Sequence, residues 1–148
     1  MQFTSAARVL LQQLEGCRLT AYQDQAGVWT IGYGHTGGVQ QGMQWTQEQA
    51  DAQLDADLKR FVSGVASFVA PTDLTDNQFS ALVIFAFNVG LLAFSGSTAL
   101  RNIRCGQLEH VVPAMALWNK ITDRSGVRVL NPGLVKRRDA EAVLWSTP

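Results

Sequence analysis

The sequence predicts an α+β fold that is mainly helical, with one small antiparallel β-sheet beside a helical bundle. Apolar residues recur at helical spacing before residue 16 and again after residue 46. Between them, glycines are dense around the run Val28–Ile31, which favours a strand. A chain of 148 residues that is 47% hydrophobic can bury a core of its own, so we expect one domain, residues 1–148.

The first helix is predicted over residues 3–15. Its apolar positions share one face and are Phe3, Ala6, Ala7, Leu10 and Leu14. Glu15 is expected to close the helix, because Gly16 suits the left-handed conformation that often follows a helix end.

The sheet is predicted over residues 18–42. Two strands, Leu19–Tyr22 and Val28–Tyr33, flank a turn at Asp24–Gly27. A third short strand is predicted near Val39–Gln41. Strand alternation would place Thr30 beside Gly32 on one face, where a hydroxyl next to a glycine could approach a ligand or hold a water.

The helical region is predicted over residues 46–148. Thr46-x-x-Gln49 and Thr75-x-x-Gln78 are capping boxes that begin two helices, and the first helix ends before Pro71. The second, Phe79–Val89, is apolar nearly all round and should occupy the centre of the core.

Three further helices complete this region. Two short ones are predicted at about 97–105 and 108–119, and Pro113 should kink or shorten the second of them. Asn131-Pro132 then provides an N-cap and a first-turn proline for a last helix that runs to about Trp145.

Composition excludes several classes of protein. The net charge is zero, which argues against a nucleic-acid partner, although residues 101–148 carry 8 basic and 4 acidic groups. Cys17 and Cys105 lack zinc-ligand spacing, so we expect free thiols and no metal; one disulfide between them is the alternative. No secretory signal precedes Leu14, and Phe79–Phe94 is shorter than the roughly 20 residues of a membrane span, so no membrane insertion is expected.

Two carboxyl groups have contrasting predicted surroundings. Glu15 faces the negative end of a helix dipole, which disfavours its ionised form, whereas Asp24 lies in a polar turn and should stay ionised. A pair of this kind is what a glycosidase needs, with one carboxylic acid to protonate the leaving oxygen and one carboxylate to assist the attack. Each residue alone is more often structural.

The spacing Glu15-(8 residues)-Asp24-(5 residues)-Thr30 resembles the catalytic signature of phage lysozymes, glycoside hydrolase family 24. Four segments carry the resemblance in the family's order: Leu14–Tyr22 as the segment that bears the acid, Trp29–Thr36 as the sheet, Phe85–Gly90 as the central helix that borders a cleft, and Gly133–Glu141 as the closing helix of the lambdoid branch.

The resemblance implies a muramidase with a lysozyme-like fold and an active-site cleft between sheet and bundle. Glu15 would be the general acid, and Asp24 and Thr30 would hold the attacking water. Such an enzyme would cut the β-1,4 bond between N-acetylmuramic acid and N-acetylglucosamine of bacterial peptidoglycan with inversion. It would need no cofactor and no metal. We further expect a monomer that stays in the host cytoplasm until a separate pore, such as a holin, gives it access to the cell wall.

Other positions gain expected roles from the resemblance. Phe87 and Asn88 resemble cleft-lining residues, although Phe87 fits a core position better and Asn88 needs a polar partner, either a sugar amide or a backbone group. His35 and Asp57 are expected to form a structural pair. Arg137 is a candidate substrate-binding residue, and either it or Arg138 would approach Glu15; a solvated basic helix face is the alternative.

Three other functions compete with this interpretation. An inactive glycan-binding module on the same fold would not need an intact Glu15, Asp24 and Thr30. A lytic transglycosylase forms an anhydro-muramoyl product and needs no carboxylate that activates water. A helical nucleic-acid-binding protein is disfavoured by the zero net charge and the absence of a recognisable motif.

Overall fold

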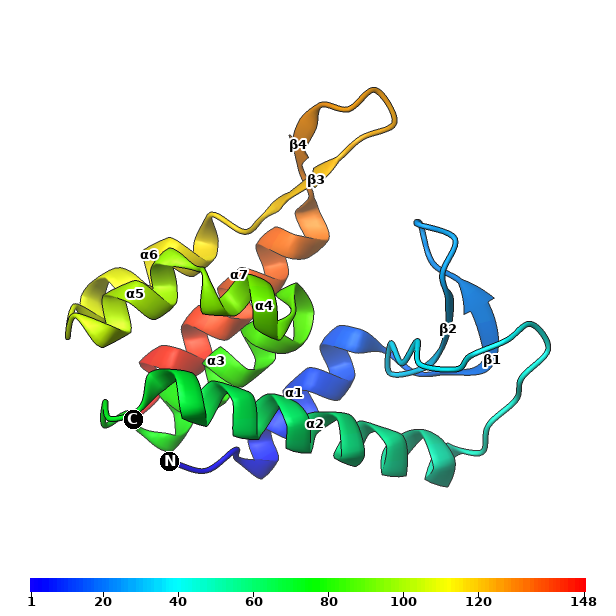
Figure 1. Ribbon diagram of the computed structural model, residues 1–148, viewed down its shortest axis with the longest axis horizontal. Coiled ribbons are helices and arrows are strands. Elements are labelled where there is room, and N and C mark those ends of the chain that lie inside the picture. Colours follow the sequence, from blue (N-terminus) through cyan, green and yellow to red (C-terminus); the bar gives the residue numbers. More distant parts are fainter. The chain divides into compact units, whose positions relative to one another are not determined.

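A computed structural model describes all residues of the chain, 1–148. Its helices and strands, in chain order, are α1 (Ser5–Glu15), β1 (Arg18–Gln23), β2 (Trp29–Gly32), α2 (Gln47–Val69), α3 (Asp76–Val89), α4 (Leu91–Ser95), α5 (Thr98–Arg104), a 3-10 turn η1 (Leu108–His110), α6 (Val111–Ala116), β3 (Lys120–Thr122), β4 (Arg128–Leu130) and α7 (Pro132–Ser146) (Figure 1). The predicted class, mainly helical with a small antiparallel sheet, is confirmed.

The chain forms two compact units. The sheet unit comprises Arg8–Arg60, and the helical unit comprises Met1–Ala7 together with Phe61–Pro148. Helices α1 and α2 each contribute residues to both units. None of the helices combines the length and the apolar character that a membrane span requires.

The sheet unit contains the predicted hairpin. Strands β1 and β2 are antiparallel, with Tyr22 opposite Thr30. The turn that joins them is closed by two backbone bonds, in which Asp24 N donates to Val28 O (3.0 Å) and Gly27 N donates to Asp24 O (3.0 Å). Gly27 has a φ of 79°, a conformation that glycine adopts without steric cost.

The prediction of a third strand near Val39–Gln41 is wrong, because these residues form no strand. The segment that lies along the free edge of β1 comes later, at Met43–Trp45. There Ala21 N donates to Met43 O (2.9 Å), and Trp45 N donates to Leu19 O (2.8 Å). Gly38 and Gly42 both have positive φ, so the chain between them turns instead of extending.

Both predicted capping boxes are present. At the start of α2, Thr46 N donates to Gln49 Oε1 (2.8 Å), and Gln49 N donates to Thr46 Oγ1 (3.2 Å). At the start of α3, Thr75 and Gln78 exchange the same two bonds at 3.0 and 3.1 Å. These reciprocal bonds satisfy N–H groups that have no partner within the helix, so they fix where each helix begins.

The core of the helical unit is built around α3, as predicted. Its residues Phe79–Ala86 are all buried, and α3 packs along α7 (Figure 1). The rings of Phe94 and Trp118 pack against Phe85, with centroids 6.2 and 5.8 Å from that of Phe85. A helix that is apolar on all sides is stable in water only when other elements bury it in this way.

The helix predicted at 108–119 is divided and shortened. Residues Leu108–His110 form a 3-10 turn, and α6 occupies only Val111–Ala116. Pro113 lies in the first turn of α6, where its missing N–H removes no intrahelical bond.

A second hairpin was missed within the region predicted to be helical. Strands β3 and β4 pair with Lys120 opposite Leu130 and Thr122 opposite Arg128. Its turn repeats the chemistry of the first: Asp123 N donates to Val127 O (2.8 Å), Gly126 N donates to Asp123 O (3.0 Å), and Gly126 has a φ of 84°. The sequence signal, Asp-x-x-Gly-Val, was therefore the same in both hairpins.

Candidate active site

Glu15 is the last residue of α1, as predicted, and its side chain is half-buried. The helix ends there because Gly16 takes a φ of 66° while its N–H still donates to Gln12 O (3.0 Å). The carboxyl group lies beside Gly34, where an added Cβ would be 3.6 Å from Glu15 Oε2. The backbone of a second segment therefore borders the carboxyl group.

That second segment is a tight turn between Ile31 and His35, whose backbones exchange two hydrogen bonds of 2.9 Å. Gly32 and Gly34, inside the turn, have φ values of 63° and 86°. The strand pattern predicts open space beside Thr30 at Gly32, but the structure shows none there. The Trp45 ring covers it, and a Cβ at Gly32 would meet that ring at 2.9 Å.

Asp24 lies at the exposed turn between β1 and β2. Its Oδ1 accepts hydrogen bonds from Ala26 N and Val28 N, both at 2.8 Å. These bonds orient the carboxylate and leave its second oxygen, Oδ2, outside the turn. The same arrangement at Asp123 shows that an aspartate at this position also serves the turn itself.

Thr30 is in β2 and is only 4% exposed. Its hydroxyl donates to Val28 O (2.9 Å), the same carbonyl that accepts from Asp24 N. Asp24 and Thr30 are therefore held by one shared backbone group. Because the hydroxyl hydrogen is used in this bond, its oxygen can accept a hydrogen bond from another group.

A network of polar side chains joins the turn to both helices of the sheet unit. The Tyr33 hydroxyl donates to Asp51 Oδ1 (2.9 Å) on α2 and accepts from Gln12 Nε2 (3.0 Å) on α1. Gln47 on α2 donates to both Tyr33 Oη (3.0 Å) and Asp51 Oδ1 (3.1 Å). Burial, with a contribution from the hydrogen bond to Asp51, raises the pKa of Tyr33 above its ordinary value. The network fixes Tyr33, and with it Gly34 beside the acid.

His35 and Asp57 lie in direct contact. Nδ1 of His35 is 2.9 Å from Asp57 Oδ2, and Nε2 is 3.0 Å from Gly37 O. Gln53 donates to the other oxygen of Asp57 at 3.1 Å. This contact ties the end of the turn to the middle of α2, so its place in the fold is that of a structural link.

In the helical unit, Phe87 and Asn88 lie near the end of α3. Phe87 is half-buried, with its ring centroid 4.9 Å from that of Phe61. Asn88 is exposed, and its Oδ1 accepts from Arg138 Nη2 (2.7 Å). Within the protein, the polar partner of Asn88 is therefore a guanidinium group from α7, and not a backbone group.

Arg137 and Arg138 are 7% and 3% exposed, so a solvated basic face is the wrong description of this part of α7. Both approach Glu141, which is fully buried: Arg138 Nη2 donates to Glu141 Oε1 (2.9 Å), and Arg137 Nε lies 3.6 Å from the same oxygen. Arg138 also stacks over the Phe85 ring at 4.8 Å. Buried charges of this kind persist only with partners.

Several polar residues around these positions were not predicted from the sequence: Tyr33, Asp51, Gln12, Gln47 and Glu141. Spacing offered one signal, since Gln47 and Asp51 are four residues apart and share a helix face. Both cysteines are free thiols, as predicted. No group of three or more His, Cys, Asp or Glu side chains is arranged to hold a metal ion.

Comparison with known proteins finds one family model and several relatives that match most of the chain. The phage lysozyme family model matches residues 12–141. The endolysin of Acyrthosiphon pisum secondary endosymbiont phage 1 is 38% identical over 147 residues, which are 99% of each chain. The endolysin of Salmonella phage P22 is 38% identical over 81% of this chain and 85% of its own.

Solved structures agree with these sequence matches. The muramidase domain of SpmX from Asticaccaulis excentricus superposes with a TM-score of 0.91 at 38% identity and covers 99% of both chains. A point mutant of P22 lysozyme has a TM-score of 0.80 at 34% identity and likewise covers 99% of both chains.

Proposed function

Because this chain belongs to the phage lysozyme family, we propose that it hydrolyses the β-1,4 bond between N-acetylmuramic acid and N-acetylglucosamine, with Glu15 as general acid. It is a lysozyme-type glycoside hydrolase. The observation that carries the finer proposal is the constellation in the sheet unit: a helix-terminal carboxyl group, and a second carboxylate held with a hydroxyl by one shared carbonyl. The product would be cut bacterial cell wall, and the outcome would be lysis of the host.

Glu15 is suited to donate a proton to the leaving oxygen. It lies at the carboxyl end of α1 and is half-buried. Gly34 presents backbone without a side chain next to its Oε2, so a substrate oxygen can approach the acid from that side. The Tyr33 network keeps this backbone in place.

Asp24 and Thr30 are suited to hold a water molecule. Asp24 Oδ1 is committed to the turn, so the free Oδ2 is the atom that would accept a proton from water. The Thr30 hydroxyl donates to Val28 O, so its oxygen would accept the second hydrogen of the same water. A threonine hydroxyl is a weak nucleophile unless a base takes its proton, and the Val28 carbonyl cannot do so, which leaves water as the attacking group.

This assignment implies inversion. Inverting glycosidases hold their two carboxyl groups roughly 6.5–9.5 Å apart so that a water fits beneath the sugar, and retaining enzymes hold them about 5–5.5 Å apart. NMR spectra recorded early in the cleavage of an oligosaccharide should show the α-anomer first. If the β-anomer came first, Asp24 would be attacking the sugar directly and the water-holding role of Thr30 would be wrong.

The role of Glu15 is tested by Glu15→Gln, which keeps the shape of the side chain but removes its acidic proton. We expect the rate of peptidoglycan cleavage to fall by about a hundredfold or more, with the thermal midpoint of unfolding little changed. Glu48→Gln is the matched control, since Glu48 lies exposed in the first turn of α2. Near-normal cleavage by Glu15→Gln would rule out the proposed acid.

Access to the wall completes the proposal. We infer that the enzyme acts as a monomer and reaches the periplasm through a membrane pore such as a holin. Two relatives, from Pseudomonas phage phiKMV and Escherichia phage Mu, are named SAR-endolysins, so release routes differ within the family. Expression in Escherichia coli with and without a co-expressed holin tests this point. Lysis should require the holin, and lysis of cells that lack it would refute pore-dependent release.

A further inference from the structure

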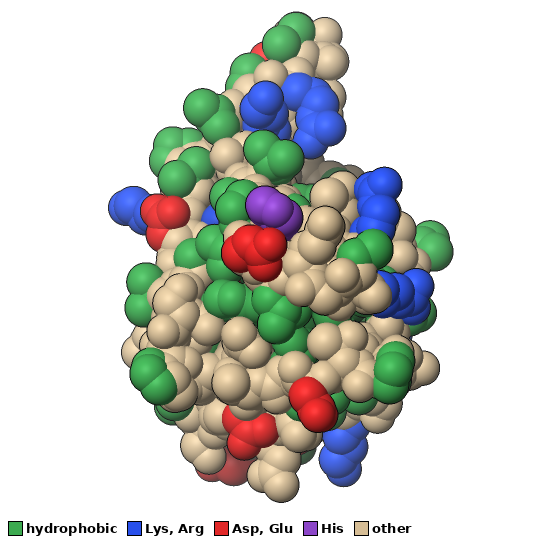
Figure 2. Space-filling view, turned by 90° about the vertical axis from the view of Figure 1, so that its left-hand side faces the viewer, with side chains coloured by type: hydrophobic (Ala, Val, Ile, Leu, Met, Phe, Trp, Pro, Cys, Tyr) green, Lys and Arg blue, Asp and Glu red, His purple; other side chains and the backbone are tan.

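The β3–β4 hairpin and the residue Leu117 before it carry an unusual surface. Leu117, Val127 and Leu130 are 74%, 55% and 62% exposed, although large aliphatic side chains favour burial. Three cations, Lys120, Arg124 and Arg128, lie among them, all exposed. Figure 2 shows hydrophobic and basic side chains next to one another on this hairpin, at the top of the view. Nothing in the proposed reaction uses these residues.

Strand register brings part of this surface together. Lys120 lies opposite Leu130, and Thr122 lies opposite Arg128, so these four side chains share one face of the hairpin. Asn119 and Asn131 extend the pairing, since Asn131 N donates to Asn119 O (2.9 Å). On this face is a surface pocket of about 510 Å³, which we call the hairpin pocket, lined by Leu117, Asn119, Lys120, Arg128 and Leu130.

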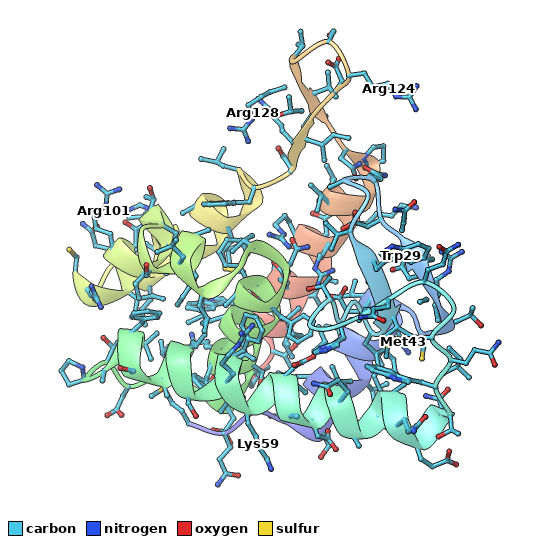
Figure 3. All side chains as sticks on the ribbon, turned by 45° about the vertical axis from the view of Figure 1, so that its right-hand side comes forward. Trp29, Met43, Lys59, Arg101, Arg124 and Arg128 are labelled. Carbon is cyan, nitrogen blue, oxygen red and sulfur yellow. The ribbon has the colours of Figure 1, made fainter.

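The charge of the hairpin pocket is not neutralised by the hairpin itself. Lys120 and Arg128 are in no ion pair. Asp123, the one acidic residue between them, is held in its turn by Ser125 and Val127; the hydrogen bond from Ser125 is the main reason that its pKa is lowered. Arg124 and Arg128 extend to opposite sides of the hairpin, so Arg124 is not part of the pocket (Figure 3).

We propose that the hairpin pocket binds a carboxylate of the short peptides that substitute the muramic acid residues of peptidoglycan. This inference rests on the proposed function. A guanidinium and an ammonium group together favour a carboxylate. Leu117 and Leu130 provide an apolar wall for the aliphatic side chains of such a peptide, and the Asn119 amide offers polar contacts. A nucleic acid would use the two cations but not the aliphatic wall.

The consequence for the enzyme is selectivity for glycan strands that carry peptides. Contacts that hold the peptide equally well in the ground state and in the transition state lower KM without raising kcat, and we expect the hairpin pocket to act in this way. Loss of the pocket should therefore raise KM on peptide-bearing strands and leave kcat unchanged. Strands without peptides should be cleaved with the same parameters by wild type and variant.

The kinetic test compares the double variant Lys120→Gln/Arg128→Gln with the single variant Arg124→Gln, which removes a cation of the same hairpin outside the pocket. Each is assayed on intact peptidoglycan and on strands from which an amidase has removed the peptides. The double variant should raise KM about tenfold on intact substrate only. An equal rise on both substrates, or an equal effect of Arg124→Gln, would overturn the proposal.

A binding test separates this inference from the proposed function. The peptide L-Ala–γ-D-Glu–meso-diaminopimelate–D-Ala is titrated into ¹⁵N-labelled protein and followed by NMR. We expect shifts at the amides of Lys120, Arg128 and Leu130 that the double variant loses, whether or not the protein cleaves glycan. Absence of these shifts would refute the pocket, even for an active muramidase. Binding to phosphatidylglycerol vesicles that depends equally on Arg124 would assign the hairpin to a lipid surface instead.

Discussion

Asp24 and Asp123 hold their turns through the same hydrogen bonds, yet we assign catalysis only to Asp24. In each turn the Oδ1 atom accepts two backbone N–H bonds of 2.8–3.0 Å, and a glycine with positive φ follows three residues later. The turn therefore explains why an aspartate is present at either position. What distinguishes Asp24 is its surroundings, since Val28 O also fixes the hydroxyl of Thr30.

These twin turns allow a sharp test of Asp24. Asparagine keeps the oxygen that the turn needs but cannot take a proton from water, so Asp24→Asn and Asp123→Asn should lower stability by similar small amounts. Peptidoglycan cleavage should fall by about a hundredfold or more in Asp24→Asn and stay near normal in Asp123→Asn. Equal activities of the two variants, measured together with their unfolding curves, would leave Asp24 with only a structural role.

Residue roles could be predicted from the sequence only where the chemistry is local. The helix end at Glu15 and the turn at Asp24 follow from neighbours within a few positions. The partner of Asn88 does not, because Arg138 is 50 residues away and arrives only when α7 packs on α3. The burial of Arg137 and Arg138 has the same origin.

At the scale of elements, the reliable signals were capping boxes and turns. The box at Thr46 lies directly before α2, and the box at Thr75 lies directly before α3, which begins at Asp76, three residues before the Phe79 predicted from the apolar run. The β3–β4 hairpin was missed although its turn matches that of β1–β2, because its strands have only three residues each and little apolar alternation. The strand predicted near Val39–Gln41 failed because the glycines on either side turn the chain.

Tyr33 connects three elements of the sheet unit, and its pKa predicts how their stability depends on pH. Because the folded state raises this pKa above 10.0, the unfolded chain loses the proton first as pH rises. The stabilisation by Tyr33 should therefore be complete below about pH 10 and diminish above it. Urea unfolding should show the stability advantage of wild type over Tyr33→Phe shrinking as the pH rises from about 10 to about 11. A constant difference across that range would contradict the role given to Tyr33.

At the scale of the whole molecule, the prediction of fold and family rests mainly on the order of elements and on the spacing of Glu15, Asp24 and Thr30. The phage lysozyme match over residues 12–141 spans both units, and solved relatives superpose over 99% of the chain. A net charge of zero conceals an excess of basic residues after residue 100, three of which lie on the β3–β4 hairpin. The sequence shows this excess of basic residues, but it does not show that Lys120 and Arg128 share one face of the hairpin, because that depends on strand register.

The central claim, that the chain hydrolyses the muramic acid bond with water, is tested most directly by mass spectrometry of peptidoglycan digested with the wild-type protein. Hydrolysis predicts fragments that end in reducing N-acetylmuramic acid, each heavier by one water than an anhydro-muramoyl fragment. Fragments that end in anhydro-muramic acid would identify a transglycosylase and remove the need for Asp24 and Thr30. Undigested peptidoglycan would instead identify a glycan-binding protein on the lysozyme fold.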